Sequence, residues 1–85
     1  MNIKVLGPGC PKCHRLNQLV REVVEELDLD ATVEYVQDIA KILEYPILTT
    51  PGLVINEKVI SSGRVHTKGE VIQLIKNAAD MEKDA

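Results

Sequence analysis

Within the first third of the chain, the residue pattern changes from that of a strand to that of a helix, and this change restricts the fold most. Asn2–Leu6 is a short run of β-favouring residues that ends at Gly7-Pro8-Gly9, which predicts a strand followed by a loop. Over residues 11–27 the apolar side chains recur at helical spacing instead, on a stripe made by Leu16, Val20, Val23 and Leu27. The chain therefore begins as a strand, a loop and an amphipathic helix.

Residues 31–36 return to a strand pattern, with β-branched side chains at alternate positions. Two strands joined by a helix form a right-handed parallel unit, so we expect these first two strands to be parallel neighbours. Asp38 can then cap a short helix. The spacing of Ile39, Ile42 and Leu43 on that helix predicts that all three face the core.

A hairpin follows a segment, residues 46–51, that has a proline at each end and so cannot be helical. Residues 53–55 and 58–61 are the two predicted strands, joined around Asn56-Glu57. They form a tight hairpin. Because glycine is favoured in a two-residue turn, Glu57 fits such a turn poorly, and a longer loop stays open as an alternative. The hairpin extends the sheet in the antiparallel sense.

Thr67 and Glu70 have the spacing of a capping box, which predicts the start of a last helix. Its inward stripe is Val71, Leu74, Ile75 and Ala78. The chain is thus predicted to be one α/β domain over residues 1–85, with residues 80–85 as a frayed polar tail. The order is βαβαββα, with a four-stranded mixed sheet and helices on both faces.

The composition suits a small aliphatic core and argues against several partners. Hydrophobic residues make up 45% of the chain although Phe and Trp are absent, so Ile, Leu and Val must form the core. The formal net charge of −3 and the lack of a basic stripe argue against nucleic acid as a partner. No apolar run approaches the length of a membrane span, and the N-terminus lacks a signal-peptide pattern. We therefore expect a cytoplasmic protein.

The motif Cys10-Pro11-Lys12-Cys13 lies where the first loop enters the first helix. A bond between these cysteines closes too small a loop to stabilise the fold, so chemistry is the first explanation for their spacing. With Cys10 as N-cap, Pro11 falls at the first helical position, where proline is favoured. Unpaired backbone N–H groups, the helix dipole and Lys12 then stabilise a Cys10 thiolate. Cys13 falls on the apolar stripe, which predicts its burial.

An exposed Cys10 beside a sheltered Cys13 is the asymmetry that a two-step disulfide exchange requires. The Cys10 thiolate would attack a disulfide of a protein or small molecule, and Cys13 would then release the reduced substrate. The pair stores two electrons, so we expect no cofactor and no metal, only a substrate and an unidentified reductant. The predicted function is that of a thiol–disulfide oxidoreductase.

The two cysteines are also compatible with three different roles. A zinc site would need four ligands, and only Cys10, Cys13, His14 and His66 could supply N or S donors. Cys10 to His14 also matches the C-x-x-C-H haem-attachment motif, but covalent haem would require export. Both cysteines could instead be inert core residues, against which the loop position of Cys10 argues. Outside a metal site, His14 is expected on the helix surface and His66 in a loop.

With these features the chain resembles the thioredoxin superfamily, and it is most similar to its short glutaredoxin-like and thioredoxin-like members from prokaryotes. The C-x-x-C motif follows the first strand, Thr49-Thr50-Pro51 precedes the hairpin, and Gly63 follows the last strand. The resemblance covers nearly the whole chain and implies a thioredoxin-like fold. It also implies that Pro51 is cis against the Cys10–Cys13 pair, and that the Thr50 backbone binds an extended substrate segment.

The chain also departs from that superfamily. Thioredoxins carry a Trp before the motif and a buried acid on the first strand, where this chain has Gly9 and, as the strand's one charged residue, Lys4. The group that handles the Cys13 proton is therefore unassigned. Glutathione-binding glutaredoxins carry an aromatic residue in the motif and acidic residues after a glycine pair, where this chain has Lys12 and then Ser61-Ser62-Gly63-Arg64. A glutathione-coupled glutaredoxin and a non-catalytic partner-binding module stay as alternatives, and we expect a monomer.

Overall fold

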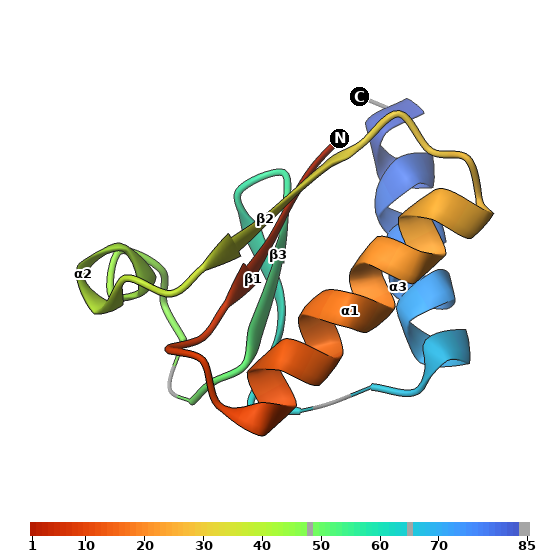
Figure 1. Ribbon diagram of the computed structural model, residues 1–85. Helices are drawn as coiled ribbons and strands as arrows, with labels where there is room; N and C mark the ends of the chain where they lie inside the picture. Colours follow the sequence, from red (N-terminus) through yellow and green to blue (C-terminus); the bar gives the residue numbers. More distant parts are fainter. Residues whose placement is uncertain (48, 65, 84–85) are drawn as a thin grey trace.

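The elements follow one another in the order that the sequence predicts. The computed structural model describes residues 1–47, 49–64 and 66–83. Its elements are β1 (Asn2–Leu6), α1 (Pro11–Glu26), β2 (Thr32–Val36), α2 (Ile39–Ile42), β3 (Gly52–Ile55), β4 (Lys58–Ser62) and α3 (Lys68–Lys83). Figure 1 shows this βαβαββα arrangement, which confirms the predicted fold class.

The four strands form one mixed sheet with the order β2-β1-β3-β4. β1 and β2 are parallel, with Val5 opposite Tyr35, and α1 is the crossover between them. β3 runs antiparallel to β1, with Leu6 opposite Gly52, and β4 pairs antiparallel with β3. The loop that leaves β1 and the loop that enters β3 therefore lie at the same edge of the sheet.

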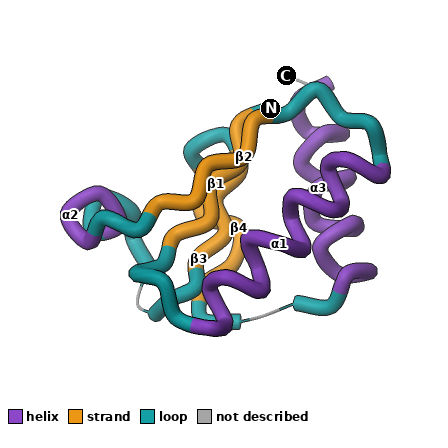
Figure 2. The backbone as a smooth tube through the Cα atoms, viewed as in Figure 1, coloured by secondary structure: helices purple, strands orange, loops and turns teal. Residues whose placement is uncertain are grey.

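Helices α1 and α3 lie together on one face of the sheet, whereas α2 lies on the other side, near one end (Figure 2). Successive side chains of a strand point to opposite faces, so Ile3 and Val5 of β1 enter one core and Leu6 the other. The larger core consists of Ile3, Val5, Leu16, Val20, Val23, Leu53, Ile55, Val71 and Ile75. The smaller core consists of Leu6, Val36, Ile42 and Val54.

The prediction for α2 is wrong in one respect. Asp38 does cap this helix, since its Oδ1 accepts a hydrogen bond from the Ala40 N–H at 2.9 Å. Of its three apolar residues only Ile42 is buried, while Ile39 and Leu43 are 60% and 75% exposed. The helix has four residues, so a single turn reaches the sheet and the rest of its stripe has no covering partner among the residues that the structure describes.

The hairpin forms as predicted, whereas the last helix differs from expectation at its end. β3 and β4 are joined by a two-residue turn, because Ile55 pairs with Lys58 and both Asn56 and Glu57 have positive φ angles, 51° and 67°. The tight hairpin around Asn56-Glu57 is therefore confirmed, and the longer loop is not formed. Helix α3 continues to Lys83, so part of the segment predicted as a tail is helical.

Candidate redox site

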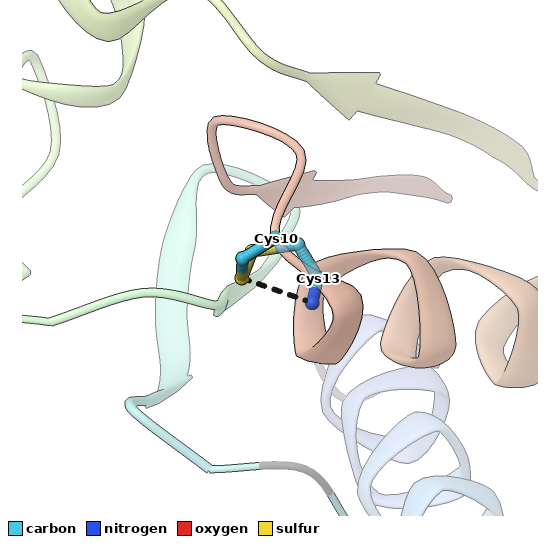
Figure 3. The surroundings of a disulfide bond; sticks show 2 residues. All are labelled: Cys10 and Cys13. Carbon is cyan, nitrogen blue, oxygen red and sulfur yellow. Dashed lines mark hydrogen bonds between the residues drawn. A yellow bond between two sulfur atoms is a disulfide. The ribbon is translucent and has the colours of Figure 1, made fainter.

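The two cysteines form a disulfide at the start of α1 (Figure 3). Cys10 is the N-cap residue, with extended backbone angles, and Pro11 occupies the first helical position. The Cys10 Sγ accepts a hydrogen bond from the Cys13 N–H at 3.3 Å. The cap geometry predicted from the sequence is thus present, and it directs a helix N–H without an intrahelical partner at the Cys10 sulfur.

The two sulfur-bearing residues differ in exposure. Cys10 is partly exposed, whereas Cys13 is completely buried and belongs to the buried stripe of α1. Gly7 makes this burial possible. A Cβ atom added at Gly7 would overlap the Cys13 Sγ and would lie 2.8 Å from the Cys13 Cβ. Sequence reasoning treated Gly7 as a loop signal and missed that it makes room for the second cysteine.

Thr50 and Pro51 lie at the same edge of the sheet as the disulfide. Their peptide bond is cis, as the resemblance implied. Pro51 is buried, and its carbonyl accepts a hydrogen bond from the Gly63 N–H at 2.8 Å. Gly63 has a φ angle of 75° and lies directly against Thr49, so a side chain there would collide with it. Thr50 is partly exposed beside this fixed segment.

An apolar groove of about 460 Å³ lies next to these elements. It is lined by Pro8, Ile39, Ile42, Leu43, Ile47, Thr49 and Thr50. Pro8 belongs to the loop that ends at Cys10, and Thr50 precedes the cis proline, so the groove reaches the two loops that carry the site. The sequence signal that could have found it is the apolar stripe of α2, which the spacing alone directs to the core.

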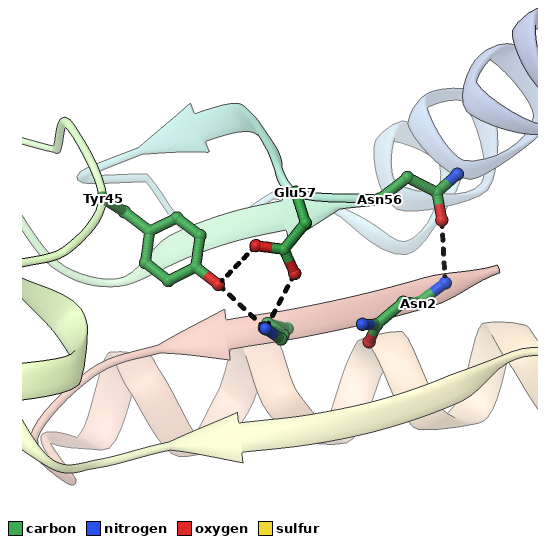
Figure 4. Close-up of polar contacts among 5 residues, drawn as sticks. Asn2, Tyr45, Asn56 and Glu57 are labelled. Carbon is green, nitrogen blue, oxygen red and sulfur yellow. Dashed lines mark hydrogen bonds and ion pairs between the residues drawn. The ribbon is translucent and has the colours of Figure 1, made fainter.

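Lys4 does not lie in the redox site. Its Nζ donates to Glu57 Oε1 at 2.8 Å and to the Tyr45 hydroxyl at 2.9 Å, and that hydroxyl donates to Glu57 Oε2 at 3.0 Å. Figure 4 shows Tyr45 and Glu57 converging beside the hairpin turn. The hydrogen bonds to Glu57 and then Tyr45 raise the pKa of Lys4, and the bonds from Lys4 and then Tyr45 lower the pKa of Glu57. This cluster fastens the turn to β1.

The two histidines have different surroundings. His14 is exposed on α1, as predicted, and its ring meets the Tyr35 ring edge-on at a centroid distance of 5.4 Å. His66 does lie in a loop, but it is buried, with its Nε2 2.6 Å from the Ser61 Oγ. Sequence reasoning missed this burial because only the fold brings Ser61 and His66 together.

Among residues 1–47, 49–64 and 66–83, no group of three or more His, Cys, Asp or Glu side chains gathers into a possible metal site.

Comparison with known proteins gives consistent matches. A family model described as a thioredoxin domain matches residues 1–76, a range that includes both cysteines and Thr50–Pro51. A thioredoxin of Methanothermobacter thermautotrophicus is 35% identical over 75 residues, which cover 88% of this chain and 97% of that protein. A thioredoxin of Methanocaldococcus jannaschii is 32% identical over 75 residues, which cover 88% of this chain and 86% of that protein. In the part of the chain that the structure describes, no helix has the length and apolarity to cross a membrane.

Proposed function

Since the chain belongs to the thioredoxin domain family and is a thiol–disulfide oxidoreductase, we propose that it reduces disulfides with Cys10 as nucleophile and Cys13 as resolving thiol. The observation that carries this assignment is the contrast between the two sulfurs. Cys10 is partly exposed and accepts a helix N–H, whereas Cys13 is buried. A substrate disulfide therefore meets the Cys10 sulfur first.

The reaction proceeds in two exchanges. The Cys10 thiolate bonds to one substrate sulfur, the substrate S–S bond breaks, and the other substrate sulfur leaves as a thiolate that takes up a proton. Cys13 then gives up its proton, bonds to Cys10 and releases the second substrate sulfur. The substrate gains two electrons, and the protein ends as the Cys10–Cys13 disulfide, the form that the structure contains. An external reductant restores the dithiol, so no other cofactor takes part.

The start of α1 supports Cys10 as the attacking thiolate. The Cys13 N–H already points to the Cys10 sulfur, and the positive end of a 16-residue helix lies behind it. Lys12, exposed in the first turn, adds a positive charge, and no acidic residue occupies that turn. These features favour a thiolate over a thiol and lower the cost of forming the nucleophile.

The substrate that fits this surface is a protein segment in extended conformation. The backbone of Thr50 would pair with the segment in a strand-like manner, beside the cis proline. The apolar groove lined by Ile39, Leu43 and Thr50 would take a hydrophobic side chain next to the target disulfide. A small-molecule disulfide would use Cys10 but would leave most of the groove empty.

Two cysteine variants test the assignment of roles. Cys10→Ser should abolish reduction of insulin disulfides, because the nucleophile is absent. Cys13→Ser should instead accumulate a mixed disulfide between Cys10 and the substrate, detectable by mass spectrometry. In the reduced wild-type protein, iodoacetamide should alkylate Cys10 before Cys13. Faster alkylation of Cys13, or trapping of substrate on Cys13, would reverse the assignment.

The reduction potential of the Cys10–Cys13 couple indicates the reductant. Thioredoxins have potentials of about −270 mV and glutaredoxins of roughly −200 to −230 mV. We propose that the electron donor is a thioredoxin reductase-like protein and not glutathione, because the segment Ser61-Ser62-Gly63-Arg64 carries no acidic residue to bind glutathione. Equilibration against glutathione redox buffers gives the value, and efficient turnover with glutathione alone would favour the glutaredoxin alternative.

We also propose that the protein works as a monomer in the cytoplasm. There the thiol pool is reducing, so a C-x-x-C pair cycles between its two states and does not persist as a structural cross-link. Size-exclusion chromatography of the reduced and oxidised forms tests the oligomeric state. A redox-dependent dimer would contradict the monomer assignment.

A further inference from the structure

A second group of reactive side chains lies on β4 and α3, outside the redox site. Ser61 Oγ and His66 Nε2 are 2.6 Å apart. The other ring nitrogen, His66 Nδ1, is buried and makes no regular hydrogen bond among the described residues, but Glu70 Oε2 lies 3.5 Å from it as an ion-pair partner. A hydroxyl, an imidazole and a carboxylate thus follow one another, each within reach of the next.

The three residues belong to different parts of the fold. Ser61 is on β4, His66 lies in the loop that follows, and Glu70 is in the first turn of α3. Glu70 is anchored separately, because its Oε1 accepts hydrogen bonds from the backbone N–H and the hydroxyl of Thr67 at 3.1 Å. These bonds, and then the contact with His66, lower the pKa of Glu70. Its carboxylate is therefore held ionised beside the imidazole.

The cluster opens onto a pocket of about 470 Å³. Ser61, which is partly exposed, and His66, which is buried, both line this pocket. Ile60 and Leu74 give this pocket apolar walls, and Arg64 lines it with a positive charge. A pocket with these walls could hold a small, partly apolar molecule against the Ser61 hydroxyl.

We propose that Ser61, His66 and Glu70 form a second active site, which hydrolyses small esters by nucleophilic catalysis. A nucleophile bonded to a base that a third group orients is the arrangement that such catalysis needs, and it recurs on unrelated folds. The site is independent of the disulfide, because none of its groups is a cysteine.

The carboxylate of Glu70 favours the tautomer with a proton on His66 Nδ1, so that Nε2 accepts the Ser61 proton. Ser61 Oγ bonds to the ester carbonyl carbon, and its proton passes to Nε2. Arg64, which lines the same pocket, would stabilise the negative oxygen that develops. The bond to the alcohol then breaks, and the alcohol takes the proton from His66. A water molecule attacks the acyl group on Ser61, also through His66, which releases the carboxylic acid and restores the serine.

The test uses the oxidised protein, in which Cys10 and Cys13 are bonded and cannot attack an ester. Release of p-nitrophenolate from p-nitrophenyl acetate is measured for the wild type, for Ser61→Ala and for Ser62→Ala. The rate in buffer alone is subtracted. General-base assistance speeds such an attack by about a hundredfold or more, so the remaining rate should be at least roughly tenfold lower in Ser61→Ala than in the wild type. Ser62→Ala removes the neighbouring hydroxyl, which also lines the pocket but is not the one that His66 Nε2 contacts, so the rate should fall much less than in Ser61→Ala.

Two further measurements separate chemistry from a structural role. Phenylmethylsulfonyl fluoride should label Ser61 in the oxidised wild type, as located by peptide mass spectrometry, and labelling should fall in Glu70→Gln. Insulin reduction by Ser61→Ala should stay at the wild-type level, which shows that the variant is folded. Equal ester hydrolysis by the wild type and a folded Ser61→Ala, or labelling confined to other residues, would mean that the cluster only ties β4 to α3.

Discussion

The two faces of the sheet are covered in very different ways. Helices α1 and α3 bury one face over a large aliphatic core, with His66 as a buried polar residue beside it. The other face has the single turn of α2, a smaller core, the Lys4–Tyr45–Glu57 cluster and two exposed apolar residues. We propose that the two faces have different roles. The face under α1 and α3 supplies most of the stability, and the face under α2 supplies the groove for substrate recognition proposed above.

The largest effect should come from shortening a side chain in the larger core. Leu16→Ala removes a completely buried side chain of α1 and should lower the free energy of unfolding by about 3–5 kcal/mol. Ile42→Ala, in the smaller core, should cost about 2–3 kcal/mol, because its helix has one turn and can adjust around the cavity. Urea denaturation of the oxidised proteins, followed by circular dichroism, compares them. If Ile42→Ala loses as much stability as Leu16→Ala, or more, the two faces do not differ in their contribution to stability.

A substitution at Gly7 should affect both the stability of the fold and the reactivity of the Cys10–Cys13 couple. Gly7→Ala places a methyl group where the Cys13 side chain lies, and overpacking of this kind costs about 1–3 kcal/mol. The displacement should also slow the attack of Cys13, so the mixed disulfide on Cys10 should accumulate during insulin reduction. Gly69→Ala is the matched control, because a Cβ there meets nothing within 4 Å. If Gly7→Ala behaves like Gly69→Ala in both assays, Gly7 does not position Cys13.

The elements on the face under α1 and α3 were predicted from the sequence more accurately than those on the face under α2. Long stripes, such as Leu16, Val20 and Val23, recur over several helical turns, so their direction is unambiguous. The position of Cys10 and the burial of Cys13 followed from the same helix, and the family resemblance added the cis proline. Local pattern and family resemblance therefore predicted the position of Cys10, the burial of Cys13 and the cis proline, but not the room that Gly7 makes for Cys13.

The remaining features depend on contacts between distant residues. A stripe on α2 shows which side chains share a face, but not whether another element covers that face, and so Ile39 and Leu43 were misplaced. Glu57 tolerates a positive φ angle in the turn, where glycine is preferred, and it is bonded there to Lys4, 53 residues away. Neither arrangement can be seen from residue types and spacing alone.

The Lys4–Glu57 pair should give a smaller, pH-dependent effect. The pKa of Glu57 is lowered in the folded protein, so its contribution is complete above the ordinary carboxyl value of about 4.3 and is lost as the pH falls through the lowered value. The pKa of Lys4 is raised, so its contribution disappears only at strongly alkaline pH. The wild type should therefore lose stability on acidification relative to Glu57→Gln. Parallel curves for the two proteins from neutral to acidic pH would show that the pair adds nothing.

The smallest effect on stability should come from Leu43→Ser. This variant nevertheless tests most directly whether the α2 face has a role in substrate recognition. The side chain is 75% exposed and lines the apolar groove, so Leu43→Ser should change the free energy of unfolding by less than about 0.5 kcal/mol. Its kcat/KM for insulin should nevertheless fall several-fold, because a hydrophobic side chain of the substrate loses its contact. Reduction of the small disulfide 5,5′-dithiobis(2-nitrobenzoic acid) should be unchanged. Lys41→Ser is the control, since Lys41 is exposed on the same helix but does not line the groove. Equal losses for both disulfides would place the defect at Cys10, and no loss for either would leave the α2 face without a role in recognition.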